Sequence, residues 1–391
     1  MSPAGERIFL SRAALGAIAV TFLLMGALAA GYGPMLEHLT RRFGIGLPVA
    51  GEVFSAHFAG ALTGVVASMR LLERVSGRLA VAAALAVTGL GCAGAAAAPS
   101  WATFLGAVFA VGIGWGALDI GLNQLVAHSE GRRRSALLNA LNGAFGVGAV
   151  AGPLLVSVAG GRHLSLLYAG GAALAVILIP AAARVSGRLT SPSAGEIASR
   201  PVGRAGLISL FVVGFVLYVG IETGTGGWMA SHLESVGLGS VAAATLTSGF
   251  WLALALGRLL AALVPARVPA PAIVLAGTAL AAVALLAAVY GPAAPVAYIV
   301  SGLAIAPIFP TGVVWLARLS PGDARATSWL FPAAMVGGAL VPGGISLVIA
   351  RSGVGWAPAI LAAVALGCLV AFGLAARRAR RLLSAAARSR A

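Results

Sequence analysis

Twelve apolar stretches, each long enough to cross a lipid bilayer, follow one another along almost the whole chain. A spanning helix needs about 20 mostly apolar residues, and the bilayer admits only helices and closed barrels because no water there can pair with backbone polar groups. The sequence therefore predicts an all-α membrane protein with twelve transmembrane helices, in which glycine and proline interrupt the fourth and tenth. The expected spans are 12–34, 48–70, 79–98, 102–127, 136–159, 164–184, 205–230, 240–264, 270–290, 293–317, 326–350 and 354–376.

Charged residues make up only 9% of the 391 residues, and apolar residues make up 60%. A soluble domain carries about 25% charged residues, so lipid is the solvent that suits this chain. The formal charge of +16 does not indicate nucleic acid, because the basic residues lie in short segments between apolar spans and form no single basic face. Cys92 and Cys368 are far apart within apolar spans, and neither a disulfide framework, a metal site nor a cofactor is predicted.

The arginines predict the orientation of the chain in the membrane. If the N-terminus is inside, 22 of the 26 basic residues, all of them arginine, fall in cytoplasmic segments. The outer side then keeps only Arg41, Arg42, Arg162 and Arg351. Positive charge is enriched on the cytoplasmic side of membrane proteins, so both termini are expected in the cytoplasm.

The longest polar segment follows the sixth span and divides the chain into two halves. We expect an N-terminal six-helix bundle in residues 1–184, a cytoplasmic linker in 185–204 and a C-terminal six-helix bundle with a short basic tail in 205–391. The halves repeat weakly at an offset near 190: residues 148–153 resemble 338–343, and Phe22 and Gly31 align with Phe211 and Gly220. Two pseudo-symmetric six-helix bundles form the major facilitator fold, with substrate bound between them at mid-membrane.

Two carboxylates lie inside predicted spans, Asp119 in the fourth and Glu222 in the seventh. An ionisable side chain is costly to bury in a membrane and marks a functional site by default. We expect both carboxylates to take part in ion coupling, one on each side of the membrane centre. The alternative for each is a structural hydrogen bond to a neighbouring helix.

A stripe of polar and aromatic residues runs along the fourth span. Trp115, Asp119 and Asn123 are spaced four apart and share one helix face. A ring that packs on an apolar sugar face, beside groups that bind hydroxyls, suits a polyhydroxylated ligand. Asn139 and Asn142 form a second polar stripe in the fifth span, which binds substrate or only holds helices together.

In the second half, Trp251 lies near mid-span and is a candidate substrate residue. Trp228 is either a second substrate residue or an anchor at the membrane interface. Three glycines in residues 224–227 predict a break or bend in the seventh helix that exposes backbone groups to a ligand. The alternative is a straight helix in which these glycines allow close packing. His57, within the second span, either titrates or makes a contact between helices.

Two charged segments at the predicted cytoplasmic face are candidates for gating. The stretch that contains Glu73, Arg74 and Arg78 resembles the end of the loop motif between the second and third spans of major facilitator proteins, with Met69 at an expected glycine. Arg258, after Gly257 in the eighth span, is the analogous feature of the second half.

Four stretches of the sequence resemble the fucose–galactose–proton symporter family, typified by bacterial fucose permease and related glucose/galactose transporters. They are Gly112–Asp119 through Asn123, Leu138-Asn139 through Phe145-Gly146, Tyr218–Thr223 through Trp228, and Phe309-Pro310-Thr311. The resemblance implies sugar uptake driven by an ion gradient, with Asp119 as a proton- or sugar-binding group. Fucose permease has a second acid in its first helix, which is lacking here, and some members have a histidine where Asn142 stands.

These observations predict a monomeric secondary transporter of a bacterial-type inner membrane. It takes up a sugar by alternating access, coupled to H⁺ in preference to Na⁺. A proton-driven exporter of drugs or other amphipathic compounds is the alternative within transport. The alternative of another class is a membrane-embedded enzyme, but the sequence has no HExxH, no GxSxG and no clustered His or Cys, and an enzyme is not expected.

Overall fold

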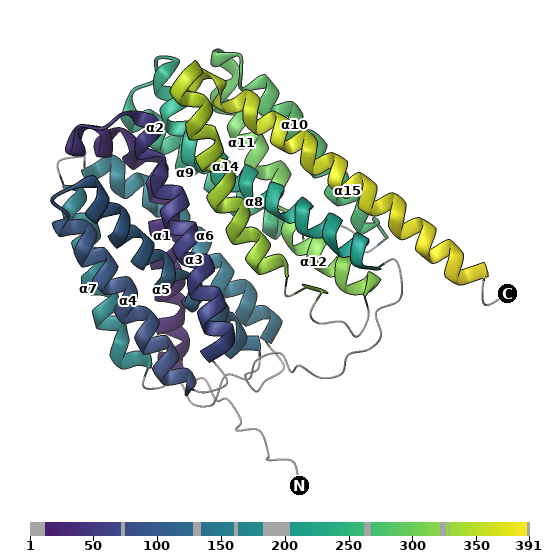
Figure 1. The fold of residues 1–391 in the computed structure, drawn as a ribbon, viewed down its shortest axis with the longest axis horizontal. Coiled ribbons are helices and arrows are strands. Elements are labelled where there is room, and N and C mark those ends of the chain that lie inside the picture. Colours follow the sequence, from purple (N-terminus) through teal and green to yellow (C-terminus); the bar gives the residue numbers. More distant parts are fainter. Residues whose placement is uncertain are drawn as a thin grey trace, which may run out of the picture. The chain divides into compact units, whose positions relative to one another are not determined.

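The computed structural model describes residues 12–71, 75–127, 134–159, 163–182, 204–261, 267–320, 326–327 and 329–388. Within these residues, every regular element is a helix, and 12 helical spans are long and apolar enough to cross a membrane (Figure 1). The predicted fold class is confirmed.

The first six spans contain seven helices, because a short helix precedes the second span. Their bounds are α1 Arg12–Phe43, α2 Leu47–Ala50, α3 Glu52–Leu71, α4 Gly77–Ala97, α5 Trp101–Ala127, α6 Arg134–Ala159 and α7 Leu164–Ala182. The second six contain α8 Arg204–Ser235, α9 Ser240–Ala261, α10 Ala270–Ala287, η1 Gly291–Ala293, α11 Ala294–Ile305, α12 Ile308–Leu319, α14 Leu330–Ser352, η2 Val354–Trp356 and α15 Ala357–Arg388.

Several helix ends differ from the sequence-based expectation. The first helix continues through Pro34 to Phe43, nine residues past its predicted end, and α15 continues to Arg388. The tenth span divides at Ala306 and Pro307 into α11 and α12, as its proline content predicts. The fourth span, by contrast, is one unbroken helix.

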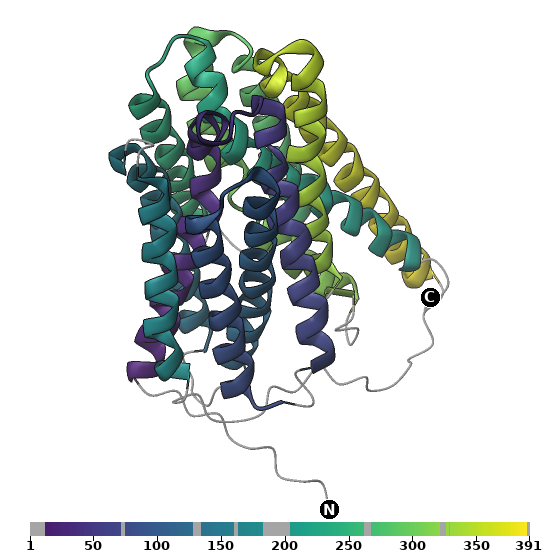
Figure 2. The ribbon, with the colours of Figure 1, turned by 60° about the vertical axis from the view of Figure 1, so that its left-hand side comes forward.

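The chain forms two compact units. One consists of Met1–Ser193 with Ser240–Ser248, and the other of Ala194–Gly239 with Gly249–Ala391. In the first unit α1 packs along α6, and α5 packs along α3 and α4. In the second, α8 packs along α14 and α15, and the long α15 also packs along α10 (Figure 2). Most of the predicted linker 185–204 lies outside the described residues, and the predicted domain boundaries remain predictions.

In each unit, two long helices touch backbone to backbone at a glycine. In the first unit, a Cβ added to Gly148 of α6 would overlap the Leu23 carbonyl group of α1. In the second, a Cβ added to Gly337 of α14 would overlap the Val216 carbonyl group of α8. Small residues permit this approach, which gains contact between helices where lipid supplies no hydrophobic drive. We call these two contacts the glycine seams.

Candidate functional site

In the first unit, two glycines fix the helix that carries Asp119. A Cβ at Gly112 of α5 would overlap the His57 carbonyl group of α3, and one at Gly116 would overlap the Ala61 carbonyl group. Because these backbones touch, α5 is held against α3 over the turns that precede the carboxylate.

The Asp119 carboxylate is half-buried and accepts a hydrogen bond from the amide of Asn123. The Nδ2–Oδ1 distance is 3.1 Å, and the same amide nitrogen donates to the Asp119 backbone carbonyl at 2.8 Å. Within the described residues, no cationic side chain forms an ion pair with this carboxylate. Asp119 and Asn123 therefore lie together, as their spacing predicts, and the carboxylate is paired with a neutral group.

Trp115 is held by protein contacts on several sides. Its indole N–H donates to the Met25 carbonyl oxygen of α1 at 3.1 Å, and its ring packs edge-on against His57, Phe58 and Phe145. The side chain is 7% exposed. The ring is therefore fixed in place one turn from Asp119, with only a small part of it open to a ligand.

His57 is fully buried beside Trp115 and pairs with Tyr32 of α1. The Tyr32 hydroxyl lies 3.1 Å from Nδ1 of His57. Its Nε2 is buried and has no hydrogen-bond partner in the part of the chain that the structure describes. The contact between helices that the sequence offered for His57 as an alternative is thus present.

The structure describes only some of the other predicted residues of the first half. Asn142 lies on α6 with an exposed side chain, and Arg78 is exposed in the first turn of α4. Asn139 lies on the same helix as Asn142, but its side chain is outside the described part of the structure. Glu73 and Arg74 also lie outside the described residues.

In the second unit, Glu222 of α8 forms an ion pair with Arg258 of α9. The Nη2 atom of Arg258 lies 3.2 Å from both carboxylate oxygens, and the Tyr218 hydroxyl donates to Oε2 from one turn earlier on α8. The side chains of Glu222 and Arg258 are 13% and 30% exposed. Glu222, which is predicted to take part in coupling, and Arg258, which is predicted to take part in gating, are thus partners in one ion pair.

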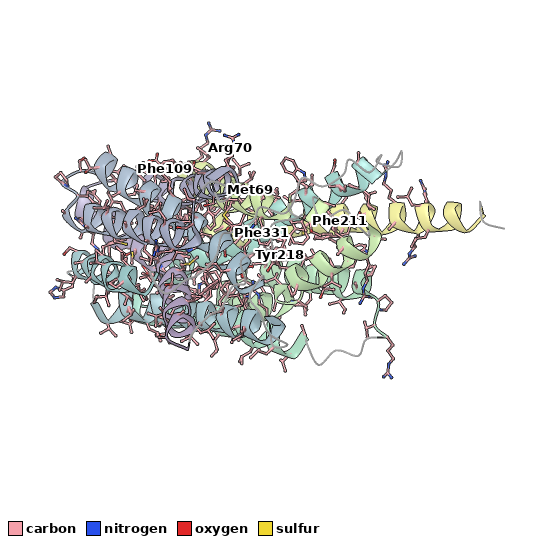
Figure 3. All side chains as sticks on the ribbon, turned by 90° about the horizontal axis from the view of Figure 1, so that it is seen from below. Met69, Arg70, Phe109, Phe211, Tyr218 and Phe331 are labelled. Atoms are coloured by element: carbon pink, nitrogen blue, oxygen red, sulfur yellow. The ribbon has the colours of Figure 1, made fainter. Side chains whose placement is uncertain are left out.

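Aromatic side chains enclose the Tyr218 end of this cluster. The ring of Tyr218 contacts Phe215 and Phe309, and Phe309 in turn contacts Phe331 of α14. Tyr218 and Phe331 lie near each other in the view of Figure 3. An apolar enclosure of this kind strengthens the attraction between Glu222 and Arg258.

Trp251 lies two turns from Arg258 on α9 and contacts α8. A Cβ built on Gly226 would lie 2.5 Å from Cζ2 of the Trp251 ring, so the glycine makes room for the indole. The indole Nε1 and the Thr225 hydroxyl are buried without hydrogen-bond partners among the described residues. Two polar groups are thus left unsatisfied beside the Glu222–Arg258 pair.

The structure shows no break at the glycines of the seventh span, because α8 is one continuous helix over Arg204–Ser235. The predicted break of this helix is therefore wrong, and Gly224 and Gly226 instead face packed side chains of Leu361 and Trp251. Trp228 is completely buried, and its indole N–H donates to the Pro342 carbonyl oxygen of α14 at 3.1 Å. The indole is an anchor between helices.

The pairing of Glu222 with Arg258 and the hydrogen bond from Tyr218 to Glu222 were not predicted from the sequence. A usable signal was present, since Arg258 falls inside an apolar span, where an unpaired charge is costly. The partner could not be read from the sequence, because it depends on how α8 and α9 are rotated toward each other.

No curated protein matches the chain. Solved structures share its fold: a nucleoside transporter, NupG, at 13% identity (TM-score 0.75, 93% of this chain and 100% of that one) and a D-xylose–proton symporter at 15% identity (TM-score 0.73, 92% and 96%). A variant of the peptide transporter POT in complex with sulfate matches at 14% identity (TM-score 0.77, 94% of each chain). At these identities the likeness shows the fold alone.

The sequence pattern of one family covers residues 18–231, more than half of the chain. The twelve membrane-capable spans agree with this family. This chain belongs to the Major Facilitator Superfamily.

Proposed function

We propose that this transporter couples the uptake of a sugar to the entry of protons. The observation that carries the proposal is the surroundings of Asp119, a carboxylate deep in a membrane span that is paired only with the neutral amide of Asn123 among the described residues. A carboxylate without a cationic partner in such a place is neutralised most simply by a proton. Trp115, Asp119 and Asn123 together supply an aromatic surface and hydroxyl-binding groups for a sugar.

In this scheme, Asp119 takes up a proton when it is open to the outer side and releases it when it is open to the cytoplasm. Sugar and proton binding to the same state favour each other, and the coupling is reciprocal. The fold supports this proposal, since a D-xylose–proton symporter shares it. The proposal also places both termini in the cytoplasm and the chain in a bacterial-type inner membrane, as a monomer.

The test uses the purified protein in liposomes, with radiolabelled sugars and an imposed proton gradient. Wild-type protein should accumulate the transported sugar against its gradient, and Asp119→Asn should abolish accumulation while it keeps counterflow exchange. Asn is close in size to Asp but cannot carry a proton, so the change separates coupling from alternation. Arg351→Gln, at the end of α14 and far along the chain from Asp119, is the control.

If Asp119→Asn accumulates sugar as steeply as the wild type, Asp119 is structural and the coupling role falls to Glu222 alone. If the same liposomes extrude a cationic dye when the gradient is imposed and take up no sugar, the protein is an exporter and the proposal is wrong.

A further inference from the structure

Among the described residues, Arg258 makes all its side-chain hydrogen bonds through one guanidinium nitrogen. Nη2 reaches both oxygens of Glu222 at 3.2 Å and the Tyr218 hydroxyl at 3.4 Å. Its Nε is buried and has no hydrogen-bond partner in the described part of the chain. A guanidinium fits a carboxylate best when two nitrogens each donate to one oxygen. In the Glu222–Arg258 pair, one nitrogen contacts both carboxylate oxygens, so this two-nitrogen fork is not formed.

If only one member of the Glu222–Arg258 pair is neutralised, the other is left as a buried charge without a counter-ion. If a proton neutralises Glu222, a guanidinium remains in a largely apolar enclosure without its counter-ion, which is strongly unfavourable. An anion that binds Arg258 removes this penalty. Conversely, an anion that displaces Glu222 from Arg258 leaves a carboxylate without its cation, and a proton then removes that penalty. Anion binding and protonation therefore favour each other.

The surroundings of Arg258 also suit the uncharged part of a sugar. Trp251 lies seven residues away, so it shares the α9 face of Arg258 at about 10 Å along the helix axis. Its indole N–H is a donor without a partner among the described residues. A monosaccharide that carries a carboxylate would reach from the guanidinium to the indole N–H, with a hydrogen bond at each end.

We infer that the substrate is a sugar acid whose carboxylate binds the fork of Arg258 while Glu222 holds a proton. This inference rests on the proposed function and narrows its substrate class from sugars to their anionic acids. The proton on Glu222 enters with the monoanion and cancels its charge, in addition to the proton that the proposed function assigns to Asp119. Two protons therefore enter with each acid, whereas one proton would enter with a neutral sugar.

We assign this second proton to Glu222 because, among the described residues, it is the carboxylate that pairs with Arg258. Tyr218 is on its own helix, and Arg258 faces it from α9. The helices packed against α8 contribute groups that lie elsewhere along it or at their own ends: Cys368 of α15 at Gly214, Tyr298 of α11 at His232, Arg378 of α15 at Gly206, Arg318 of α12 and Arg351 of α14.

The first experiment compares matched ligands on the purified protein by calorimetry. D-glucuronate and D-galacturonate are paired with D-glucose and D-galactose, which differ from them by a CH₂OH group in place of the carboxylate. An acid should bind at least roughly tenfold more tightly than its neutral parent, because hydrogen bonds to charged groups are the stronger ones. Titrations in two buffers of different ionisation enthalpy should show that the wild type takes up about one proton more for each acid bound than Glu222→Gln does.

Variants separate the two halves of the pair. Glu222→Gln mimics the protonated state, so it should still bind the acid but take up about one proton fewer than the wild type. Arg258→Lys keeps the charge and loses the fork, and it should weaken acid binding by roughly tenfold or more. Because Arg258→Gln leaves Glu222 unpaired and endangers folding, the double change Arg258→Gln with Glu222→Gln tests the loss of the cation. Arg351→Gln is the control for a distant positive charge.

The second experiment measures uptake of the acid into liposomes with the membrane potential set by potassium and valinomycin. A pH gradient should drive uptake with two protons for each acid, and an inside-negative potential should speed uptake because one positive charge then enters in each cycle. The inference is wrong if the neutral sugars bind as tightly as the acids, if only one proton enters with each acid, or if Glu222→Gln takes up as many protons as the wild type. Neutral-sugar uptake that depends on Asp119 would keep the proposed function and overturn this inference, whereas failure of both sugar classes to bind would overturn both.

Discussion

Gly226 of α8 and Trp251 of α9 are in direct contact, since the indole ring occupies the space where a side chain at position 226 would begin. The closest ring atom, Cζ2, would lie 2.5 Å from an added Cβ. Real Cβ atoms do not approach other atoms so closely, so any larger residue at position 226 has to displace the indole. The contact thus joins the helix that carries Glu222 to the helix that carries Arg258.

Gly226→Ala should destabilise the protein by about 1–3 kcal/mol, because overpacking forces the Trp251 ring out of its position. The measurement is the melting temperature of the purified protein in detergent. Gly373→Ala in α15 is the matched control, because nothing lies within 4 Å of its added Cβ, and it should be neutral or slightly stabilising. Equal melting temperatures for both variants would mean that the indole has room to move.

Gly148→Ala should have a larger effect than Gly226→Ala. The added Cβ would meet a backbone carbonyl group, that of Leu23, and a backbone cannot change rotamer as a side chain does. We expect a severe loss of folded protein, measured as the monodisperse peak in fluorescence-detected gel filtration. Gly143→Ala, on the same helix with no atom within 4 Å of its added Cβ, should give a normal peak. A normal peak for Gly148→Ala would show that the helices can separate at this seam.

Trp228→Phe should lower the stability by about 1 kcal/mol and leave substrate affinity unchanged. The change removes the donor to the Pro342 carbonyl oxygen, which still accepts a hydrogen bond from Ser346 at 3.1 Å. Thermal melting and ligand titration on one preparation check both parts. A clear fall in affinity would instead support the substrate role that the sequence suggests for Trp228.

Reporter fusions test the orientation that the arginines predict. Fusions after Arg188 and after Arg377 should both report the cytoplasm, because most of the arginines would then lie inside. Alkaline phosphatase and green fluorescent protein serve as opposite reporters, the first active only outside and the second fluorescent only inside. An active phosphatase at either position contradicts the proposed topology.

The twelve spans could be predicted because each needs only a long apolar run, which a single sequence displays directly. Helix ends were harder, as Pro34 illustrates. Proline usually ends a helix, yet α1 continues through it to Phe43. Neighbouring groups can satisfy the backbone that proline frees inside a membrane bundle.

The candidate site was predictable as far as it follows from spacing along one helix. Asp119 and Asn123 bond to each other because four residues make about one helical turn. Contacts between helices were not predictable in this way. The partner of Glu222, 36 residues along the chain, depends on the rotation of α8 against α9, and the burial of Trp228 depends on how α14 packs.

The two glycine seams restrict where this transporter can deform. Along α1 and α6, and again along α8 and α14, the backbones meet without side chains that could repack to a second arrangement. A slide by one turn would bring a bulkier residue against a carbonyl group. Each pair of helices therefore moves as one rigid body. Any bending during a transport cycle must occur in other segments, such as the break at Ala306 and Pro307.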